Sequence, residues 1–587
     1  MGISVMLAVA GILIAMPVLA SAADDAQGTR PVEVRVRAVP GDGKDDTQAV
    51  RAALEECKKH VRPVLVFEPG RYDFHAGTIP EQGGTSIVVS GLDNLTIDGR
   101  GAQLVFHGLT GAFLFRGCRN VTVRNLSIDW ERPPFSTGVI TAVAEHSFDV
   151  RVFEEFPVQG GEPVQAFMDH DPATGLPVRG GMDVYYGVTS TELVEPQVLR
   201  VHTKNPVRLS PGSLAVLRHQ VYSHNAFVFS HCENVLAQDI TVYTAPGMGL
   251  VGARCRDVTL ERFRVKIRPG TRRYLSTTAD ATHFSGCTGT ITIRDCEFEG
   301  MGDDAVNIKS GLYLTIREIQ GRDAALGQHN LKMQDPPNPG DVLEVAHTDD
   351  LLPYATVTVK SVELLEDNVH RLVFHDPLPE GVRVGDVLGN ATLVPRVRIF
   401  NCRVSRNRAR GFLLQTRDVI VEGCHFKDIT SGGIWVMTEV VYFHESIGTR
   451  NVIVRFNTFE NCNYGGPPGE SVLSVFAYLA DFRFPPKPGV HRDITLQGNR
   501  IRGSDNCGIL VAGTDGIRIL NNTIEDVCRR PGRPEGTAAI YVTSTRNAVI
   551  SGNTVLPDRQ GEAFAEALRL GPGNETATIQ VRANRGF

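Results

Sequence analysis

The chain of 587 residues lacks the features that mark several large classes of protein. It has only two tryptophans, and no run of Lys and Arg interleaves with aromatic residues. The formal net charge is −6, so no basic surplus favours nucleic acid, heparin-like polymers or polyuronates as partners. No Cys and His residues have the spacing of a zinc site, and no acid cluster has the full ligand set of another metal. We therefore expect no metal and no other cofactor.

Long apolar runs are absent after the first twenty or so residues. Residues 3 to 19 form one such run, which Pro17 breaks and Ala20-Ser21-Ala22 closes. An apolar segment followed by small residues is typical of a secretory signal, so residues 1–23 are predicted to be cleaved and the mature protein to be periplasmic or secreted. An uncleaved anchor is the alternative, although the run is shorter than the ~20 residues of a bilayer span. The oligomeric state is open, and a homo-oligomer is one possibility.

Eleven cysteines in an exported protein suggest disulfides, but the count is odd. Cys118, Cys232 and Cys255 recur in the same local context, each followed three residues later by Val. A free cysteine packs as a small hydrophobic residue, so recurrence at one repeat position predicts buried thiols, with an occasional bridge still possible.

Glycine is abundant, with 59 residues, and a short motif repeats along the chain. Its closing apolar residue falls at positions 128, 242, 265, 298, 404, 426, 459, 501, 524 and 555, so most gaps are 22 to 42 residues. Such a period is typical of one coil of a β-solenoid, and hairpin turns of a β-propeller are missing. One column of the repeat holds Asn457, Asn499, Asn522 and Asn553, which can hydrogen-bond from coil to coil as a ladder. The sequence predicts an all-β, right-handed parallel β-helix.

The ends and the gaps of the repeat define the expected organisation. An amphipathic segment is predicted to form a helix whose first turn is capped by Asp46 or Thr47 and which covers the N-terminal end of the solenoid. Two long gaps each leave an insertion of about 80 residues with alternating strands and Gly/Pro turns, which predicts a small β-barrel in each. The predicted division is a signal peptide at 1–23, a capped solenoid part at 24–134, a barrel at 135–221, coils with acids at 222–309, a barrel at 310–395 and a solenoid part at 396–587.

Three acids stand at equivalent turns of neighbouring coils. Gly302-Asp303-Asp304 opens a short alternating strand, and Asp280 has the same position one coil earlier. Aspartate is common in turns because it caps its own backbone, which is the alternative explanation for any one of them. Three carboxyl groups on one patch suit glycosidic hydrolysis, in which one acid protonates the leaving oxygen and one carboxylate activates water. Asp280, Asp303 and Asp304 are therefore the candidate catalytic residues.

Strand alternation turns Val306 and Ile308 inward, so the residues between and beside them face an external groove. The candidate substrate-binding residues selected in this way, together with Trp130 at the start of the first insertion, are His283, Asn307, Lys309, Trp435 and Trp130. Aromatic faces pack against the apolar face of a pyranose, which is the reason for including the two tryptophans. The alternatives are a structural histidine, a solvated lysine and, for Trp130, a packing anchor.

The acid pattern resembles that of the polygalacturonase-type glycosidases, which have the pectin-lyase-like solenoid fold. It departs from them because the chain has Thr278-Ala279-Asp280 and lacks their uronate-binding Arg and Lys motif. The whole chain is more similar to glycoside hydrolase family 110, the bacterial α-1,3-galactosidases, in residues 128–135, 280–284 and 300–307.

That resemblance implies a metal-independent, inverting, exo-acting enzyme that releases terminal α-1,3-linked galactose from glycans such as blood group B antigens. One of Asp303 and Asp304 is then the general acid, while Asp280 and the other one activate water. A polygalacturonase-like or other polysaccharide hydrolase is the alternative function, and a non-enzymatic carbohydrate-binding β-helix is a third.

Overall fold

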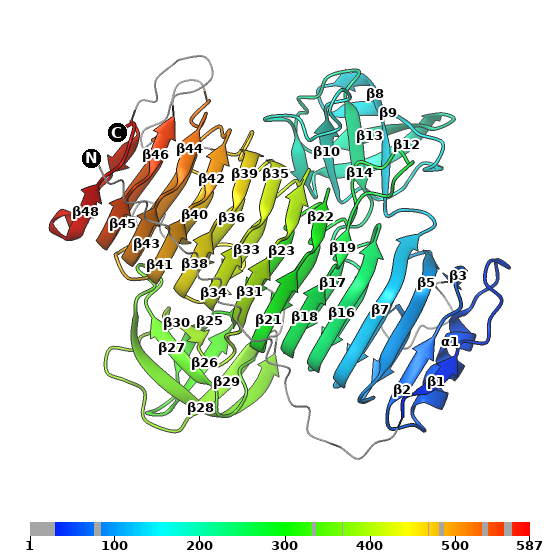
Figure 1. Cartoon of the computed structure of the whole chain (residues 1–587), viewed down its shortest axis with the longest axis horizontal. Helices are drawn as coiled ribbons and strands as arrows, with labels where there is room; N and C mark the ends of the chain where they lie inside the picture. The colour runs from blue at the N-terminus through cyan, green and yellow to red at the C-terminus, as the bar shows by residue number, and fades with distance from the viewer. Residues whose placement is uncertain are drawn as a thin grey trace, which may run out of the picture.

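The computed structural model describes residues 30–75, 84–330, 336–366, 368–467, 469–480, 486–530, 538–556 and 566–587. The predicted signal peptide lies outside these residues. The described chain forms one long solenoid of stacked strands from which two smaller domains project (Figure 1). In this part of the chain no helix is long and apolar enough to cross a membrane.

Each coil of the solenoid contributes to three parallel sheets, which we call the first, second and third sheets. The first sheet contains β4 (Thr85–Ser90), β6 (Gly111–Arg116), β15 (Phe227–Ser230), β17 (Leu250–Ala253), β20 (Thr282–Ser285), β23 (Val306–Lys309), β33 (Phe412–Gln415), β36 (Ile434–Glu439), β40 (Ser471–Tyr478), the first parts of β43 (Cys507–Leu520) and β45 (Ile540–Ser551), and β47 (Leu568–Leu570).

The second sheet contains β1 (Val32–Arg35), β2 (Pro63–Val66), the first parts of β5 (Thr96–His107), β7 (Arg119–Trp130) and β16 (Glu233–Val242), then β18 (Arg256–Glu261), β21 (Thr288–Arg294), β31 (Arg396–Phe400), β34 (Arg417–Glu422), β38 (Arg450–Arg455), β41 (His491–Gln497), the later parts of β43 and β45, and β48 (Ile579–Arg582). The third sheet contains β3 (Arg71–His75), the later parts of β5, β7 and β16, then β19 (Arg264–Val265), β22 (Glu297–Glu299), β32 (Arg403–Ser405), β35 (His425–Ile429), β39 (Thr458–Cys462), β42 (Arg500–Arg502), β44 (Thr523–Glu525) and β46 (Thr554–Leu556). The predicted parallel β-helix is confirmed.

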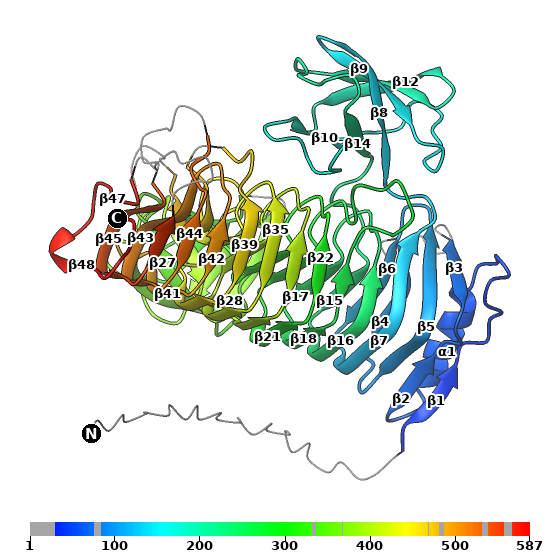
Figure 2. The ribbon, with the colours of Figure 1, turned by 45° about the horizontal axis from the view of Figure 1, so that its top comes forward.

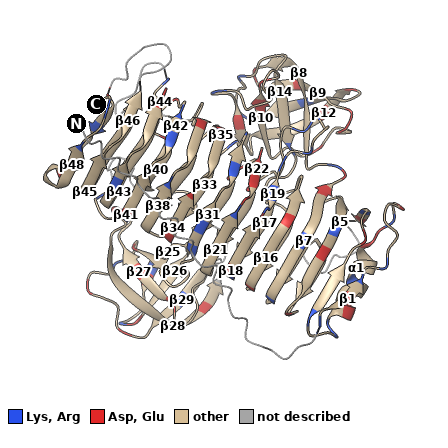
Figure 3. Ribbon diagram, viewed as in Figure 1, with Lys and Arg blue, Asp and Glu red and all other residues tan. Residues whose placement is uncertain are grey.

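At every second position along each strand the side chain points into the solenoid, and these side chains together fill its interior. Aromatic rings stack from coil to coil, with 5.2 Å between the Phe113 and Phe227 centroids and 4.7 Å between those of Phe426 and Phe459. All eleven cysteines are buried, and Cys118, Cys232 and Cys255 are the free thiols that their recurrence predicted. Charged residues of both signs are spread along the ribbon (Figure 3).

The predicted asparagine ladder is present and is longer than expected. Asn457 donates through Nδ2 to Asn499 Oδ1, Asn499 to Asn522, and Asn522 to Asn553, each over 3.0 Å. Asn553 continues the ladder to Asn584 Oδ1 over 3.0 Å. Each amide also donates to a backbone carbonyl, so the ladder fixes the register of the last coils.

The N-terminal end of the solenoid is covered by α1 (Thr47–Cys57), which buries Val50, Leu54 and Cys57 (Figure 2). Neither of the two residues expected to cap this helix does so through its side chain. Asp45 Oδ1 instead accepts the Thr47 N–H over 3.0 Å, and Asp46 Oδ2 accepts the Asp73 N–H over 3.0 Å. Asp46 therefore joins the helix to the third sheet.

The two insertions leave the solenoid at different turns and have their own cores. The first lies at the turn from the third to the first sheet, and its strands are β8 (Phe135–Ala144), β9 (Ser147–Val152), β10 (Ala166–His170), β11 (Asp183–Tyr185), β12 (Val188–Glu195), β13 (Val198–Thr203) and β14 (Leu214–Arg218). The second lies at the turn from the first to the second sheet, and its strands are β25 (Leu314–Ile319), β26 (Ala324–Gln328), β27 (Val342–Ala346), β28 (Pro353–Glu366), β29 (Val369–Phe374) and β30 (Val387–Asn390). The second closes as a barrel, whereas the first is an open sheet because its outer strands, β11 and β12, do not pair with each other.

Candidate active site

The three candidate acids lie together at the turn that leads from the third sheet into the first. Asp280 comes just before β20, Asp303 and Asp304 just before β23, and Arg410 just before β33, on three successive coils. One oxygen from each of the three carboxyl groups lies within 4.8 Å of the others. The stacked register therefore brings the three acids to one patch.

Hydrogen bonds fix Asp280 and Asp304 in place. Asp304 Oδ1 accepts the Arg410 backbone N–H over 3.1 Å, and Oδ2 accepts from Arg410 Nη2 over 2.7 Å. Asp280 Oδ1 accepts the Asp304 N–H over 3.0 Å, and Oδ2 lies 2.8 Å from His283 Nδ1. Arg410 thus binds Asp304, and Asp304 in turn binds Asp280.

Asp303 is the most accessible of the three acids. Its side chain is 14% exposed, against 5% for Asp280 and 1% for Asp304. Tyr222 Oη donates to Asp303 Oδ2 over 2.5 Å, and Arg408 Nη1 donates to Oδ1 over 3.4 Å. Asp303 is therefore the carboxyl group that a ligand in the groove can meet first.

The surroundings of Asp303 favour its ionised form. Burial opposes ionisation, but the charges of Arg408 and Arg410 and the Tyr222 hydrogen bond outweigh it, so the pKa of Asp303 is lowered from its usual value. At neutral pH this carboxyl group is a carboxylate.

The other two acids hold protons more tightly. Burial raises the pKa of Asp304 to about 7, and the charges of Asp303 and Asp280 add to this effect against the opposing charge of Arg410. Burial and the Asp303 charge raise the pKa of Asp280 as well. Burial and Lys309 lower the pKa of His283 to about 4, so His283 is neutral beside Asp280 at neutral pH.

The residues of the first sheet that the alternation predicted to face outward lie next to the acids. His283 and Asn307 are paired in register on β20 and β23. Asn307 is 5% exposed, and its Oδ1 has no hydrogen-bond partner within the described chain. Lys309 Nζ donates to Glu445 Oε1 over 2.6 Å, on β37 (Glu445–Ser446), and both side chains are buried. Glu445, which sequence reasoning missed, neutralises the predicted lysine.

Trp435 has the predicted orientation but not the predicted accessibility. Ile434 and Val436 lie in the solenoid core, so Trp435 faces out. Its side chain is only 4% exposed, because Phe476 packs edge-on at 5.1 Å and the Arg410 guanidinium lies 5.5 Å from its ring centroid. The ring supports Arg410 and is not an open surface for a sugar.

Trp130 does not line the groove, contrary to the prediction. It is 1% exposed in the solenoid core, with its ring centroid 5.1 Å from that of Phe106. The reason is strand phase: β7 continues without interruption from Ile128, which points inward, and Trp130 two residues later points to the same side.

The first insertion supplies a buried arginine that binds both acid-bearing turns. Arg218, at the end of β14, is fully buried. Its Nη1 donates to Thr278 O over 3.2 Å, to Gly302 O over 3.1 Å and to Tyr185 Oη over 2.9 Å. No feature of the sequence marks Arg218, since it lies 62 residues before Asp280 in a separate domain.

The first insertion also positions Arg408. Asp183 Oδ2 accepts from Arg408 Nε over 2.6 Å. The ring of Tyr185 lies 4.5 Å from the Arg218 guanidinium and 4.8 Å from that of Arg408. The first insertion therefore supplies Arg218 and holds Arg408, two of the three arginines whose positive charge faces Asp303.

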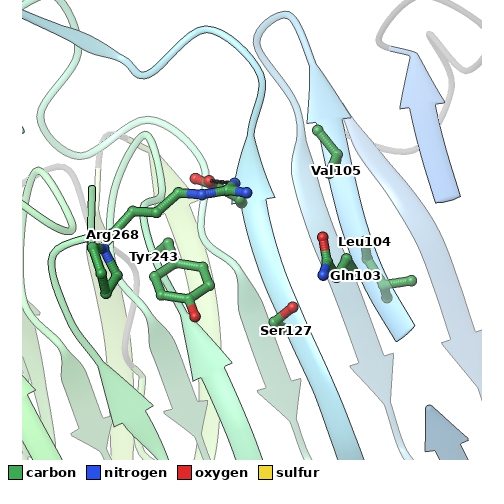
Figure 4. A pocket seen from close by; sticks show the side chains of 8 residues that line it. Gln103, Leu104, Val105, Ser127, Tyr243 and Arg268 are labelled. Carbon is green, nitrogen blue, oxygen red and sulfur yellow. Dashed lines mark hydrogen bonds and ion pairs between the residues drawn. The ribbon is translucent and has the colours of Figure 1, made fainter. Parts of the chain in front are cut away.

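One of two cavities in the described chain lies next to the acid site. One, of about 240 Å³, lies between the first insertion and the solenoid turns and is lined in part by Asp183, Arg408, Arg410, Ser431 and Glu470. The other, of about 260 Å³, lies on the third sheet away from the acids and includes Gln103, Ser127, Tyr243 and Arg268 (Figure 4). Asp129, which also lines this second cavity, accepts hydrogen bonds from Arg268 and, over 2.7 Å, from Arg273 Nη1. Since both arginines belong to the segment that leads to Asp280, Asp129 anchors that segment to β7.

The carboxyl cluster is close enough to hold a cation, but its oxygens already have donors. Each oxygen of the three acids lies within hydrogen-bond distance of Arg408, Arg410, His283, Tyr222 or a backbone N–H. A divalent cation would have to displace these donors in the presence of two guanidinium groups, which disfavours metal binding.

Two family models match parts of this chain, and their descriptions agree with the architecture. A model described as "GLAA-B beta-barrel domain II" matches residues 335–388, and a model described as "Right handed beta helix region" matches residues 379–468. Among solved structures, the family 28 exopolygalacturonase of Yersinia enterocolitica is 11% identical, with a TM-score of 0.47 over 95% of this chain and 78% of its own.

Relatives of known name are similar over nearly the whole chain. The alpha-1,3-galactosidase A of Shewanella woodyi is 27% identical over 88% of this chain and 89% of its own. The alpha-1,3-galactosidase B of Bacteroides thetaiotaomicron is 26% identical over 91% of each. The predicted resemblance to bacterial α-1,3-galactosidases is therefore confirmed.

Proposed function

We propose that the protein is a galactosidase-type glycoside hydrolase that releases terminal α-1,3-linked galactose from glycans, including blood group B determinants. The observation that carries this proposal is the cluster of Asp280, Asp303 and Asp304 at the same turn of two stacked coils. Similarity to relatives named alpha-1,3-galactosidase over 88% and 91% of the chain supports the choice of linkage.

The protonation states support a division of roles within the cluster. Asp303, with its lowered pKa and its accessible side chain, is proposed as the general base that deprotonates water. Asp304, with a pKa of about 7, is proposed as the general acid that protonates the leaving oxygen. Asp304 is only 1% exposed, but its raised pKa keeps it protonated to a higher pH than Asp303, and a general acid must carry a proton. Asp280 accepts the backbone N–H of Asp304 and so helps to position that acid.

Variants and small nucleophiles test this division. Asp304→Asn should act far better on an aryl galactoside with a good leaving group than on an oligosaccharide, because such a group needs no proton. Asp303→Asn should be rescued by azide, which needs no base. If the two variants exchange these behaviours, the roles are reversed while the hydrolase proposal stands.

We propose inversion of configuration, as the resemblance implies. The approach of the carboxyl oxygens within 4.8 Å is closer to the ~5–5.5 Å of retaining enzymes than to the ~6.5–9.5 Å of inverting ones. This spacing taken alone favours retention, so the proposal of inversion rests on the family resemblance. NMR of the first product decides the question: inversion releases β-galactose, and α-galactose would show retention.

A uronate substrate is disfavoured by the pairing of the cations beside the acids. Arg408 binds Asp183, Arg410 binds Asp304 and Lys309 binds Glu445, so each positive charge already has a carboxylate partner. The decisive assay compares release of galactose from α-1,3-galactosyl oligosaccharides with hydrolysis of polygalacturonate. Activity on polygalacturonate alone would replace the proposal with a polygalacturonase.

A further inference from the structure

We infer that Tyr222 is a substrate-contacting residue of this site, whose exposed ring packs against the sugar while its hydroxyl group holds Asp303. This inference rests on the proposed hydrolase function. Tyr222 lies in the linker between β14 and β15, where the first insertion returns to the solenoid.

Exposure separates Tyr222 from the other side chains that bind the acids. It is 48% exposed, whereas the side chains of His283, Arg408 and Arg410 are 16%, 21% and 28% exposed. Its Oη is 2.5 Å from Asp303 Oδ2, so the exposed ring stands directly beside the reactive carboxyl group. Both tryptophans, with 4% and 1% exposure, are unavailable for stacking. A pyranose that reaches Asp303 will therefore meet the face or edge of this ring.

The backbone next to Tyr222 is anchored from two sides. Val221 is fully buried, and its carbonyl oxygen accepts from Thr278 Oγ1 over 2.9 Å. Its N–H donates to Gln165 Oε1 of the first insertion over 3.0 Å. Thr278 belongs to the segment that carries Asp280, so the tyrosine is fixed relative to both the acids and the first insertion. A ring held in this way needs little ordering when a ligand binds.

The hydroxyl group acts on Asp303 together with a defined set of neighbours. Arg408, Arg410 and Arg218 face Asp303 with positive charge, Asp280 and Asp304 face it with carboxyl groups, and Tyr185 lies behind the arginines. A hydroxyl that donates to a carboxylate stabilises its ionised form. Removal of the hydroxyl should raise the pKa of Asp303, so the activity that is lost on acidification would be lost at a higher pH.

Two substitutions separate the ring from the hydroxyl. Tyr222→Phe keeps the ring, and we expect kcat to fall about ten-fold with KM changed less than about two-fold, while the acidic limb of the pH profile moves upward. Tyr222→Ala removes the ring as well, and KM should rise about ten- to a hundred-fold in addition. Tyr186→Phe is the matched control, because Tyr186 is 67% exposed on the first insertion and, among the described residues, donates none of the hydrogen bonds to the three acids.

Galactose binding, measured by calorimetry on the same variants, tests the ring contact independently of turnover. Weaker binding by Tyr222→Ala but not by Tyr222→Phe supports the inference, and unchanged binding by both overturns the ring contact. An unshifted pH profile for Tyr222→Phe overturns the role of the hydroxyl. A wild-type protein that binds galactose but releases none from any α-1,3-galactoside would instead overturn the proposed function. Melting temperatures show that the variants fold.

Discussion

The two inserted domains are similar in length and strand pattern but differ in what they contact. The first joins the turn between the third and first sheets, where its Arg218 and Asp183 reach the acid-bearing turns and Arg408. The second joins the next turn of the coil, where its Glu344 accepts from Arg417 over 2.7 Å and from Arg450 over 3.2 Å. In the described chain no hydrogen bond to the three acids comes from the second domain.

The difference shows that the place of an insertion in the coil decides its role. Every acid of the site stands at the turn from the third to the first sheet. A domain inserted at this turn therefore lies on the same side of the solenoid as the acids. The second domain acts on the site only at its base, where β24 (Gly311–Leu312) pairs with β37 and so places Glu445 opposite Lys309. The first insertion is part of the site, and the second is a lateral support.

The largest effect on turnover is expected from substitution of the acids, and the effects of variants in the two inserted domains are compared with it. Asp280→Asn, Asp303→Asn and Asp304→Asn should each lower turnover by at least about 10³-fold, because each loses an acid or base at constant volume. Asp418→Asn, an exposed residue of β34 in the second sheet, is the control and should leave turnover unchanged. Any of the three variants that keeps more than a tenth of wild-type activity would be removed from the catalytic cluster.

The contact of the first insertion can be broken at its buried arginine. Arg218→Lys keeps the charge but cannot donate to Thr278 O, Gly302 O and Tyr185 Oη in the same geometry, so kcat/KM should fall about ten- to a hundred-fold. Arg200→Lys in the same domain, where Arg200 pairs with Asp149 at 2.8 Å, is the matched control and should have wild-type kinetics. Equal kinetics for both variants would reduce the first insertion to a passive wall.

The second insertion should affect stability without affecting catalysis. Glu344 is 7% exposed and binds two arginines, so Glu344→Gln should lower the free energy of unfolding by about 3 kcal/mol with kcat/KM unchanged. Denaturant unfolding and steady-state kinetics on the same preparation test both halves of this expectation. A large loss of kcat/KM in the folded variant would show that the barrel takes part in the site and would remove the contrast between the domains.

The sequence predicts those parts of the molecule that depend on the repeat and on the stacking of neighbouring coils. The asparagine ladder and the recurrent cysteines mark the stacking, and the stacking alone brings Asp280 to Asp303 and Asp304. The prediction that Trp130 lines the groove is wrong, although strand alternation counted from Ile128 places its side chain in the core.

The missed residues come from contacts between distant segments. Arg218 and Tyr222 reach the acids only because the first insertion docks at one angle, which no local pattern encodes. Glu445 depends on the pairing of two very short strands, β24 and β37. The burial of Trp435 depends on Phe476 of the next coil, so alternation gave its direction but not its exposure.

The smallest effect is expected from removal of metal ions. If Arg408, which the first insertion holds, and Arg410 supply the positive charge beside the acids, a metal is not needed there, and EDTA should leave kcat and KM unchanged. The reason is occupancy: a cation that takes a carboxylate oxygen must first break its bond to Arg410, Tyr222 or His283. Added calcium should also fail to restore the Arg218→Lys variant. Activity that is lost in EDTA and recovered with calcium would make Asp280, Asp303 and Asp304 metal ligands, and the first insertion would then position a metal-dependent enzyme such as a lyase.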